Sequence, residues 1–90
     1  MLTQYARTPG NDRNPFTLET RFVYAIPTRE HVVLRLYDVL GREVRTLVNQ
    51  PQNAGTYRVS LETGTLQSGV YFARLQAGSL TRQRKLLLRR

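Results

Sequence analysis

The segment YDVLGREV, residues 37–44, brings two carboxylates and an arginine together within eight residues. Asp38 and Glu43 could in principle act as the acid and the base of a glycosidase, whose two carboxyl groups must flank a substrate cleft. Asp38 and Gly41, however, stand at the first and fourth positions of a turn, where a type I turn prefers these residues. Asp accepts hydrogen bonds from the backbone two residues on, and Gly supplies the positive φ that closes a bulged hairpin. We therefore predict a hairpin turn here instead of a catalytic pair.

No other group of side chains in the sequence indicates catalysis. His31 is the single histidine, which excludes a metal site built from several histidines. Nothing places a base beside Ser60, Ser68 or Ser79, so a nucleophilic triad is not indicated. The chain also has no cysteine, and no glycine-rich phosphate loop is followed by a helix pattern. We therefore expect no enzyme activity, no cofactor and no metal, with His31 as a surface residue.

Apolar and polar residues alternate in short runs from residue 20 onward, which is the pattern of half-buried β-strands. Segments rich in turn-forming residues separate these runs at 27–29, 38–41, 49–55, 64–69 and 77–79. The residues expected to face a common core are Phe22, Tyr24, Ile26, Val32, Leu34, Leu36, Tyr57, Val59, Leu61, Tyr71, Ala73, Leu75, Leu86 and Leu88. This spacing predicts an all-β fold, an immunoglobulin-like antiparallel β-sandwich of about seven short strands. A partly open barrel is the alternative.

The first 13 residues differ in composition from the rest of the chain. They carry no periodic pattern and are rich in Thr, Pro, Gly, Asn and Arg, so we expect a linker over residues 1–13, with Met1 as an added start. Asn14, Pro15 and Phe16 then open a single folded domain over residues 14–90. Its small size leaves a thin margin of stability.

The apolar tip of the predicted hairpin is unusual, because turn tips are normally polar. Val39 and Leu40 occupy its two central positions. Either these side chains fold back to cover one end of the sandwich, which we favour, or they are exposed for a partner to contact.

The chain is strongly basic, with 14 Lys and Arg against 6 Asp and Glu and a formal net charge of +8. This imbalance indicates affinity for polyanions such as nucleic acid, anionic lipid or phosphorylated polysaccharide. Outward arginines that keep a sheet soluble and protect its edges are the simpler explanation, which we favour. Nucleic-acid binding needs exposed aromatic rings, and only Tyr5, Tyr37 and Phe72 lie outside the predicted core faces, so we expect no nucleic-acid partner.

No apolar stretch approaches the length of a membrane span, so we expect no transmembrane segment. The first residues also lack the apolar centre of a signal peptide. If the protein is exported, its export signal lies elsewhere, and this chain is part of a longer precursor.

An ordered series of sequence blocks resembles a known family. The blocks NPF, YDVLGREVRTLV, AGTY, LQSGVYFARLQAG and the terminal RKLLLR follow one another as in the C-terminal sorting domain (type A) of the type IX, or Por, secretion system. The resemblance covers about residues 14–90 and rests on the order of the blocks.

This resemblance implies a function in export and cell attachment. Family members are immunoglobulin-like domains at the C-termini of proteins exported by Bacteroidetes and their relatives. Their implied partners are the outer-membrane secretion machinery, a sortase-like peptidase that removes many of these domains, and anionic lipopolysaccharide to which the cargo is attached. The resemblance thus implies a non-catalytic sorting module on a secreted parent protein, typically a hydrolase. It also implies a place at the cell surface, on the outer side of the outer membrane of a Gram-negative bacterium.

Two alternatives and one expectation accompany this interpretation. An immunoglobulin-like spacer, or a carbohydrate-binding or adhesive module of a secreted glycoside hydrolase, would have the same architecture. Carbohydrate-binding modules usually expose tryptophan, and this chain has none. We expect the domain to be a monomer.

The residues that match the family's blocks are the candidates for sorting recognition. They are Tyr37, Asp38, Gly41, Arg42, Glu43, Gly69, Val70, Tyr71, Lys85, Leu86, Leu87, Leu88 and Arg89. One additional residue, Arg90, follows the family's usual final basic residue. A short basic terminal strand could pair with a partner sheet through its backbone. Our hypothesis is that this strand and the 37–44 hairpin form the recognition surface.

Overall fold

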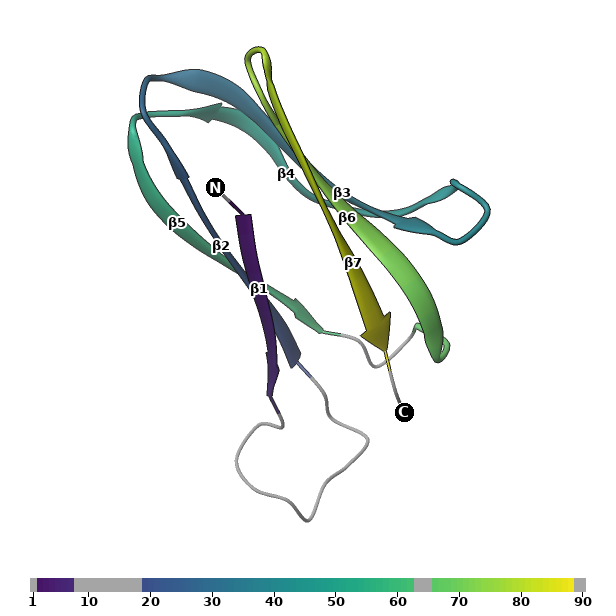
Figure 1. The fold of residues 1–90 in the computed structure, drawn as a ribbon. Coiled ribbons are helices and arrows are strands. Elements are labelled where there is room, and N and C mark those ends of the chain that lie inside the picture. The colour runs from purple at the N-terminus through teal and green to yellow at the C-terminus, as the bar shows by residue number, and fades with distance from the viewer. Residues whose placement is uncertain (1, 8–18, 63–65, 89–90) are drawn as a thin grey trace.

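The computed structural model describes residues 2–7, 19–62 and 66–88, and within these ranges the chain forms seven strands and no helix. The strands are β1 (Leu2–Arg7), β2 (Glu19–Ile26), β3 (Glu30–Asp38), β4 (Glu43–Gln52), β5 (Gly55–Glu62), β6 (Gly69–Ala77) and β7 (Leu80–Leu88). They form a three-stranded sheet in the order β1-β2-β5 and a four-stranded sheet in the order β4-β3-β6-β7, and every pair is antiparallel. The predicted all-β sandwich is confirmed (Figure 1).

The strand order differs from that of a constant-type immunoglobulin domain at one strand. In that fold the first, second and fifth strands form one sheet with the fourth at its edge, and the third, sixth and seventh form the other. Here β4 pairs with β3 in the second sheet. Among the described residues, no strand therefore lies beside β5 on its outer edge.

The core lies between the two sheets and contains alternate residues of the strands, because successive side chains of a strand point to opposite faces. All of the predicted core positions are buried except Tyr57 and Val59, which are half-buried. The rings of Tyr24 and Tyr57 stack with centroids 5.5 Å apart. The buried Tyr24 hydroxyl donates to Oε1 of Gln52 at 2.6 Å, which ties β2 to the end of β4 across the sandwich.

A tyrosine corner begins the sixth strand. The Tyr71 hydroxyl donates a hydrogen bond to the carbonyl oxygen of Gln67, four residues earlier, at 2.8 Å. Gly69, two residues before the tyrosine, has a φ of 156°. A tyrosine near the start of the sixth strand that bonds back to the upstream backbone is a hallmark of immunoglobulin-type sandwiches, so this contact supports the immunoglobulin-like assignment.

The same local structure recurs at the start of β5. The Tyr57 hydroxyl donates to the carbonyl oxygen of Asn53 at 2.6 Å, again four residues earlier. Gly55, two residues before the tyrosine, has a φ of 152°. The segments NAGTY and QSGVY are therefore two copies of one strand-opening motif.

The N-terminal boundary of the folded part differs from the predicted one. Strand β1 lies within residues 1–13, where we expected a linker, and it pairs with β2 from Leu2 opposite Tyr24 to Arg7 opposite Glu19. Strand β1 forms because the edge of β2 offers backbone groups for it to pair with. This pairing joins distant parts of the chain, so the alternation of residues within 1–13 does not reveal it. The predicted domain start at Asn14, Pro15 and Phe16 lies outside the described residues and stays a prediction.

The turn predicted over 49–55 is shorter than expected, because β4 continues to Gln52 and only Asn53 and Ala54 connect it to β5. Pro51 is tolerated there because β4 is an edge strand, in which one missing N–H need not break a ladder. The buried Gln52 side chain, bonded to Tyr24, holds this last part of the strand in place.

Candidate recognition surface

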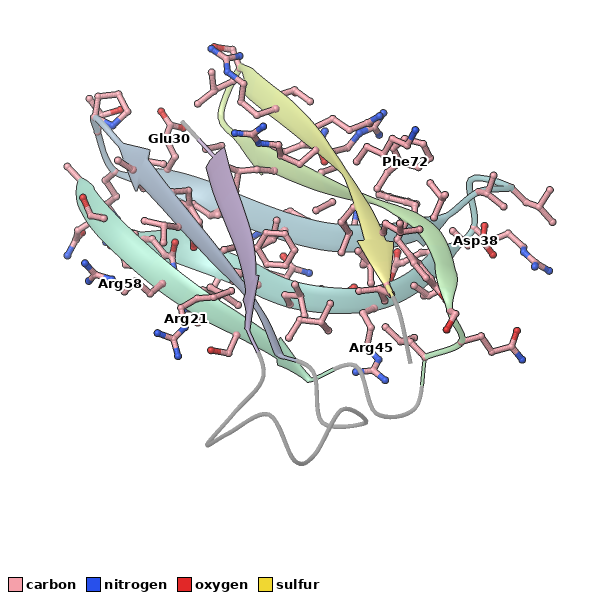
Figure 2. All side chains as sticks on the ribbon, turned by 60° about the horizontal axis from the view of Figure 1, so that its bottom comes forward. Arg21, Glu30, Asp38, Arg45, Arg58 and Phe72 are labelled. Atoms are coloured by element: carbon pink, nitrogen blue, oxygen red, sulfur yellow. The ribbon has the colours of Figure 1, made fainter. Side chains whose placement is uncertain are left out.

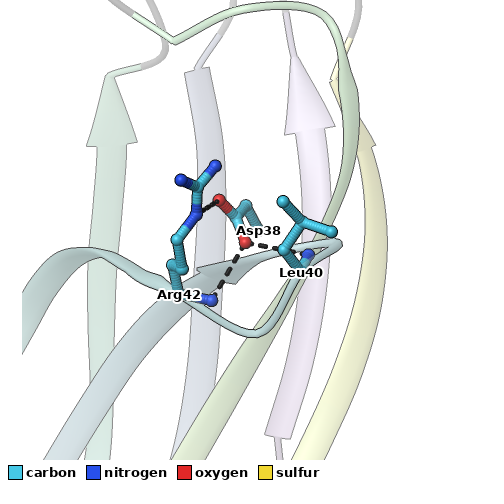
Figure 3. A network of polar contacts seen from close by, with 3 residues as sticks. All are labelled: Asp38, Leu40 and Arg42. Carbon is cyan, nitrogen blue, oxygen red and sulfur yellow. Dashed lines mark hydrogen bonds and ion pairs between the residues drawn. The ribbon is translucent and has the colours of Figure 1, made fainter.

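The hairpin between β3 and β4 is closed by the Asp38 side chain and backbone. The Asp38 carbonyl oxygen accepts a hydrogen bond from the Gly41 N–H at 3.0 Å, and Gly41 has a φ of 83°. The Oδ1 atom of Asp38 accepts hydrogen bonds from the backbone N–H groups of Leu40 and Arg42, each at 2.9 Å. Its Oδ2 accepts from Nε of Arg42 at 3.0 Å (Figure 3). The predicted turn is confirmed.

These contacts leave neither carboxylate of the segment suited to acid catalysis. The backbone hydrogen bond from Arg42 is the main cause that lowers the pKa of Asp38, whereas a catalytic acid needs a raised pKa. The Glu43 carboxylate is also engaged, because it pairs with Nε of Arg35 at 3.3 Å and accepts from the Thr46 hydroxyl at 2.6 Å. The two acids of the segment are therefore structural.

The tip of the hairpin is exposed, so the favoured expectation that it folds back over the sandwich is wrong. Val39 and Leu40 are 69% and 73% exposed. They occupy the two central positions of the turn, whose backbone is held by Asp38. Two aliphatic side chains are thus exposed to solvent at the tip of this hairpin.

A row of apolar side chains continues from this tip across the outer face of the four-stranded sheet. Tyr37 of β3 lies opposite Phe72 of β6, which lies opposite Lys85 of β7. Two residues further along the same face, Val70 lies opposite Leu87, which is 60% exposed. We call the six apolar residues here the tip patch, and they are Tyr37, Val39, Leu40, Val70, Phe72 and Leu87.

A groove lies between the tip and this sheet face. Its volume is about 210 Å³ and it is lined by Tyr37, Asp38, Val39, Gly41, Phe72, Arg74 and Gln83. The Arg74 guanidinium carbon lies 5.6 Å from the centre of the Tyr37 ring, so a cation covers one part of the aromatic floor. The groove therefore offers aromatic rings, an arginine and an amide to one ligand or partner side chain.

The structure divides the predicted site residues into two groups. Tyr37, Arg42, Glu43, Val70, Lys85 and Leu87 are exposed or half-buried. The others have structural roles or lie in the core: Asp38 and Gly41 form the turn, Gly69 and Tyr71 form the tyrosine corner, and Leu86 and Leu88 are buried. Arg89 lies outside the described residues. Among the described residues, the side chains of the first group and of Asp38, which lines the groove, are accessible to a partner in the folded domain.

Four residues of the groove were absent from the predicted site, namely Val39 of the hairpin tip and three residues of the outer sheet face. Phe72, Arg74 and Gln83 lie on the outer face of β6 and β7. The alternation of residues along a strand could have identified the three sheet residues. Phe72 and Arg74 alternate with predicted core positions of the same strand, and Gln83 lies two residues from Lys85 and so shares its face.

Other candidate sites gain no support. Within the described ranges, no three His, Cys, Asp or Glu residues lie close enough to hold a metal ion. His31 is exposed, as expected, and its Nε2 lies 2.7 Å from Oδ1 of Asn49. No helix found in the described part of the chain is long and apolar enough to span a membrane.

Comparison with known proteins identifies one family. Residues 14–89 match the family model described as secretion system C-terminal sorting domain, which confirms the resemblance drawn from the sequence blocks. Strand β1 lies before the matched region. No curated protein and no solved structure matched the chain.

Proposed function

The chain belongs to the family of secretion system C-terminal sorting domains, and from this premise we propose that the tip patch is the surface that the type IX secretion machinery recognises. Membership in the family makes the domain a sorting signal for type IX secretion, in a family of non-catalytic signal modules. The observation that carries the proposal is the exposure of three large aliphatic side chains, those of Val39, Leu40 and Leu87.

Exposed aliphatic groups are unusual on the outer face of an antiparallel sheet, which is normally polar. Clustered apolar side chains with a polar rim mark contact surfaces, because their removal from water on binding is favourable. In the tip patch the apolar centre is bordered by Lys85, which lies opposite Phe72, and by Arg74 above the Tyr37 ring. A partner surface with apolar anchors and acidic groups fits this arrangement.

The buried members of the predicted site hold this surface in place. Leu86 and Leu88 are 3% exposed, and their burial anchors β7 so that Lys85 and Leu87 face outward. The Tyr71 hydroxyl similarly anchors the start of β6, next to Val70. These residues act on recognition through the fold.

We further propose that the exported parent protein is a secreted hydrolase that becomes attached at the bacterial cell surface. Arg82, Arg84 and Lys85 are exposed along β7 and offer cations to phosphate groups. Anionic lipopolysaccharide at the outer face of the outer membrane is the polyanion that the family's biology supplies.

Point substitutions test the recognition surface better than truncation of the terminal strand. Deletion of residues 85–90 would remove the core residues Leu86 and Leu88 together with Leu87, so a loss of export would not identify the cause. We propose instead to fuse the whole chain to the C-terminus of a periplasm-directed reporter in a host with this pathway. The variant carries Val39→Ser, Leu40→Ser and Leu87→Ser.

The matched control is Val33→Ser, which changes a half-buried valine on the same outer face, four residues before Tyr37 on β3. We expect the triple variant to remain folded and to lose surface delivery, and the control to be delivered normally. Normal delivery of the triple variant would refute the tip patch as the recognised surface. Failure of the unaltered fusion to reach the surface would favour a spacer or adhesive module.

A further inference from the structure

The two sheets differ in width, and the difference leaves one strand of the larger sheet partly uncovered. Strand β1 contacts β7, so the sheet β1-β2-β5 lies over β7, β6 and β3 in that order. Strand β4 then lies opposite the position beside β5, where the part of the chain that the structure describes provides no strand. In agreement with this, the apolar residues Val44, Leu47 and Val48 of β4 are only partly buried.

The facing residues of β5 are incompletely covered as well. Tyr57 and Val59 pack against the core but are half-buried, although they alternate with outward residues as core positions do. Strands β4 and β5 are joined by Asn53 and Ala54 alone and diverge from that connection (Figure 1). The partly buried apolar residues of β4 and β5 thus belong to strands that separate from each other after this connection.

Two of the other sheet edges carry features that prevent strand pairing. Strand β4 has two register shifts and contains Pro51, and both disrupt a regular edge. On β7, Arg82 and Arg84 lie opposite the buried Leu75 and Ala73, which places two exposed arginines on the inward side of an edge strand. Inward charges of this kind oppose the addition of another strand.

Strand β5 has none of these protections. It pairs with β2 without a register shift from Gly55 opposite Ile26 to Glu62 opposite Glu19. It contains no proline, and its described inward side chains, Tyr57, Val59 and Leu61, are all uncharged. Its outer edge thus retains a regular row of backbone N–H and C=O groups that can pair with an added strand.

We propose that the edge of β5 binds an extended, acidic segment of a partner protein as a fourth strand of the smaller sheet. Inward apolar residues of that segment would cover Val44, Leu47 and Val48, and its backbone would pair with β5. This interface is separate from the tip patch, because the tip patch lies on the outer face of the other sheet.

The charge of the partner follows from the outward side of β5. Arg58 is exposed and alternates along β5 with the inward residues Tyr57 and Val59. Figure 2 shows Arg58 and Arg21 on the outside of the smaller sheet, with Phe72 on the opposite side of the sandwich. Opposite charges that face each other across strands stabilise the pair, and like charges destabilise it. A Glu or Asp opposite Arg58 is therefore the expected partner residue.

The probe is a capped heptapeptide of alternating valine and glutamate, close to the usual length of a strand, and its counterpart of alternating valine and lysine. Each is titrated into the whole chain and followed by amide and methyl NMR shifts and by amide hydrogen exchange. We expect the glutamate peptide to protect alternate amides of β5 and to shift the methyl groups of Val44, Leu47 and Val48. Shifts confined to another edge, or no protection on β5, would overturn the proposal.

A matched pair of charge reversals tests the role of Arg58. Arg58→Glu is expected to weaken binding of the glutamate peptide by about three- to tenfold and to strengthen binding of the lysine peptide, since an attraction becomes a repulsion. Arg82→Glu makes the same charge change on β7 and is expected to leave both affinities within about twofold. Equal effects of the two variants would refute a specific acidic strand at β5. So would a concentration-dependent dimer that protects the same β5 amides without peptide.

Discussion

Replacing Tyr71 by phenylalanine separates the structural role of this residue from a role in recognition. Tyr71 matches a block of the sorting family, but it is 8% exposed and its hydroxyl closes the corner before β6 through the Gln67 carbonyl. The substitution keeps the ring in the core and removes one hydrogen bond. We therefore expect reduced stability and unchanged delivery of a fused reporter.

The expected loss of stability depends on how deeply the hydrogen bond from Tyr71 to Gln67 is buried. A typical intramolecular hydrogen bond contributes about 0.5–1.5 kcal/mol, and the upper half applies here because the Tyr71 bond is part-buried. A loss of about 1 kcal/mol lowers the Tm of a domain of this size by about 4–8 °C. Tyr57→Phe removes the equivalent bond to Asn53 in an exposed setting, where water can replace the hydroxyl, so we expect less than about 0.5 kcal/mol.

Urea unfolding followed by circular dichroism measures both variants against the unaltered chain, and reporter delivery is measured well below the lower Tm. Equal losses for Tyr71→Phe and Tyr57→Phe would refute the argument from burial. Loss of delivery by a Tyr71→Phe domain that is folded at the assay temperature would refute the assignment of a purely structural role.

Three further predictions concern stability. Gly78→Ala should destabilise the domain by about 1–2 kcal/mol in urea unfolding, because Gly78 has a φ of 60°, a backbone conformation that is strained for a residue with a Cβ; an unchanged midpoint would contradict this backbone argument. The pKa of Asp38 is lowered in the folded chain, so its contribution to stability is present above the ordinary value of 3.8 and is lost as pH falls through the folded pKa. Asp38→Asn should accordingly flatten the decline in urea midpoint below about pH 4, and an equally steep decline in the variant would show that other carboxyls cause it. Leu88→Ala should cost about 2–5 kcal/mol, whereas Leu87→Ser should change stability by less than about 0.5 kcal/mol, because Leu88 is 3% and Leu87 60% exposed; calorimetric Tm values that fall equally would contradict the assigned orientation of β7.

Local sequence chemistry was sufficient for strands β2 to β7, for the faces of these strands and for the hairpin. Alternation with a period of two residues places Leu34 inward and Arg35 outward whatever the partner strand is, because the backbone geometry of a strand imposes it. Asp38 and Gly41 identify the turn because its hydrogen bonds and positive φ come from these residues themselves. The order of the sequence blocks identified the family for the same reason, since it needs no knowledge of contacts.

The tertiary structure alone decided which strands are neighbours and which outward residues form a surface. The apolar positions of β4 would suit pairing with either β3 or β5, so its sequence does not reveal which of the two it joins. Because β4 pairs with β3, β5 becomes an edge strand of the smaller sheet. Likewise, β1 is recognisable only from its pairing with β2. Val39 and Leu87 are far apart in the chain and come to the same side of one sheet through the pairing of β3, β6 and β7. Side-chain direction is a local property of a strand, whereas strand order depends on long-range pairing, and the recognition surface and the vacant edge both follow from strand order.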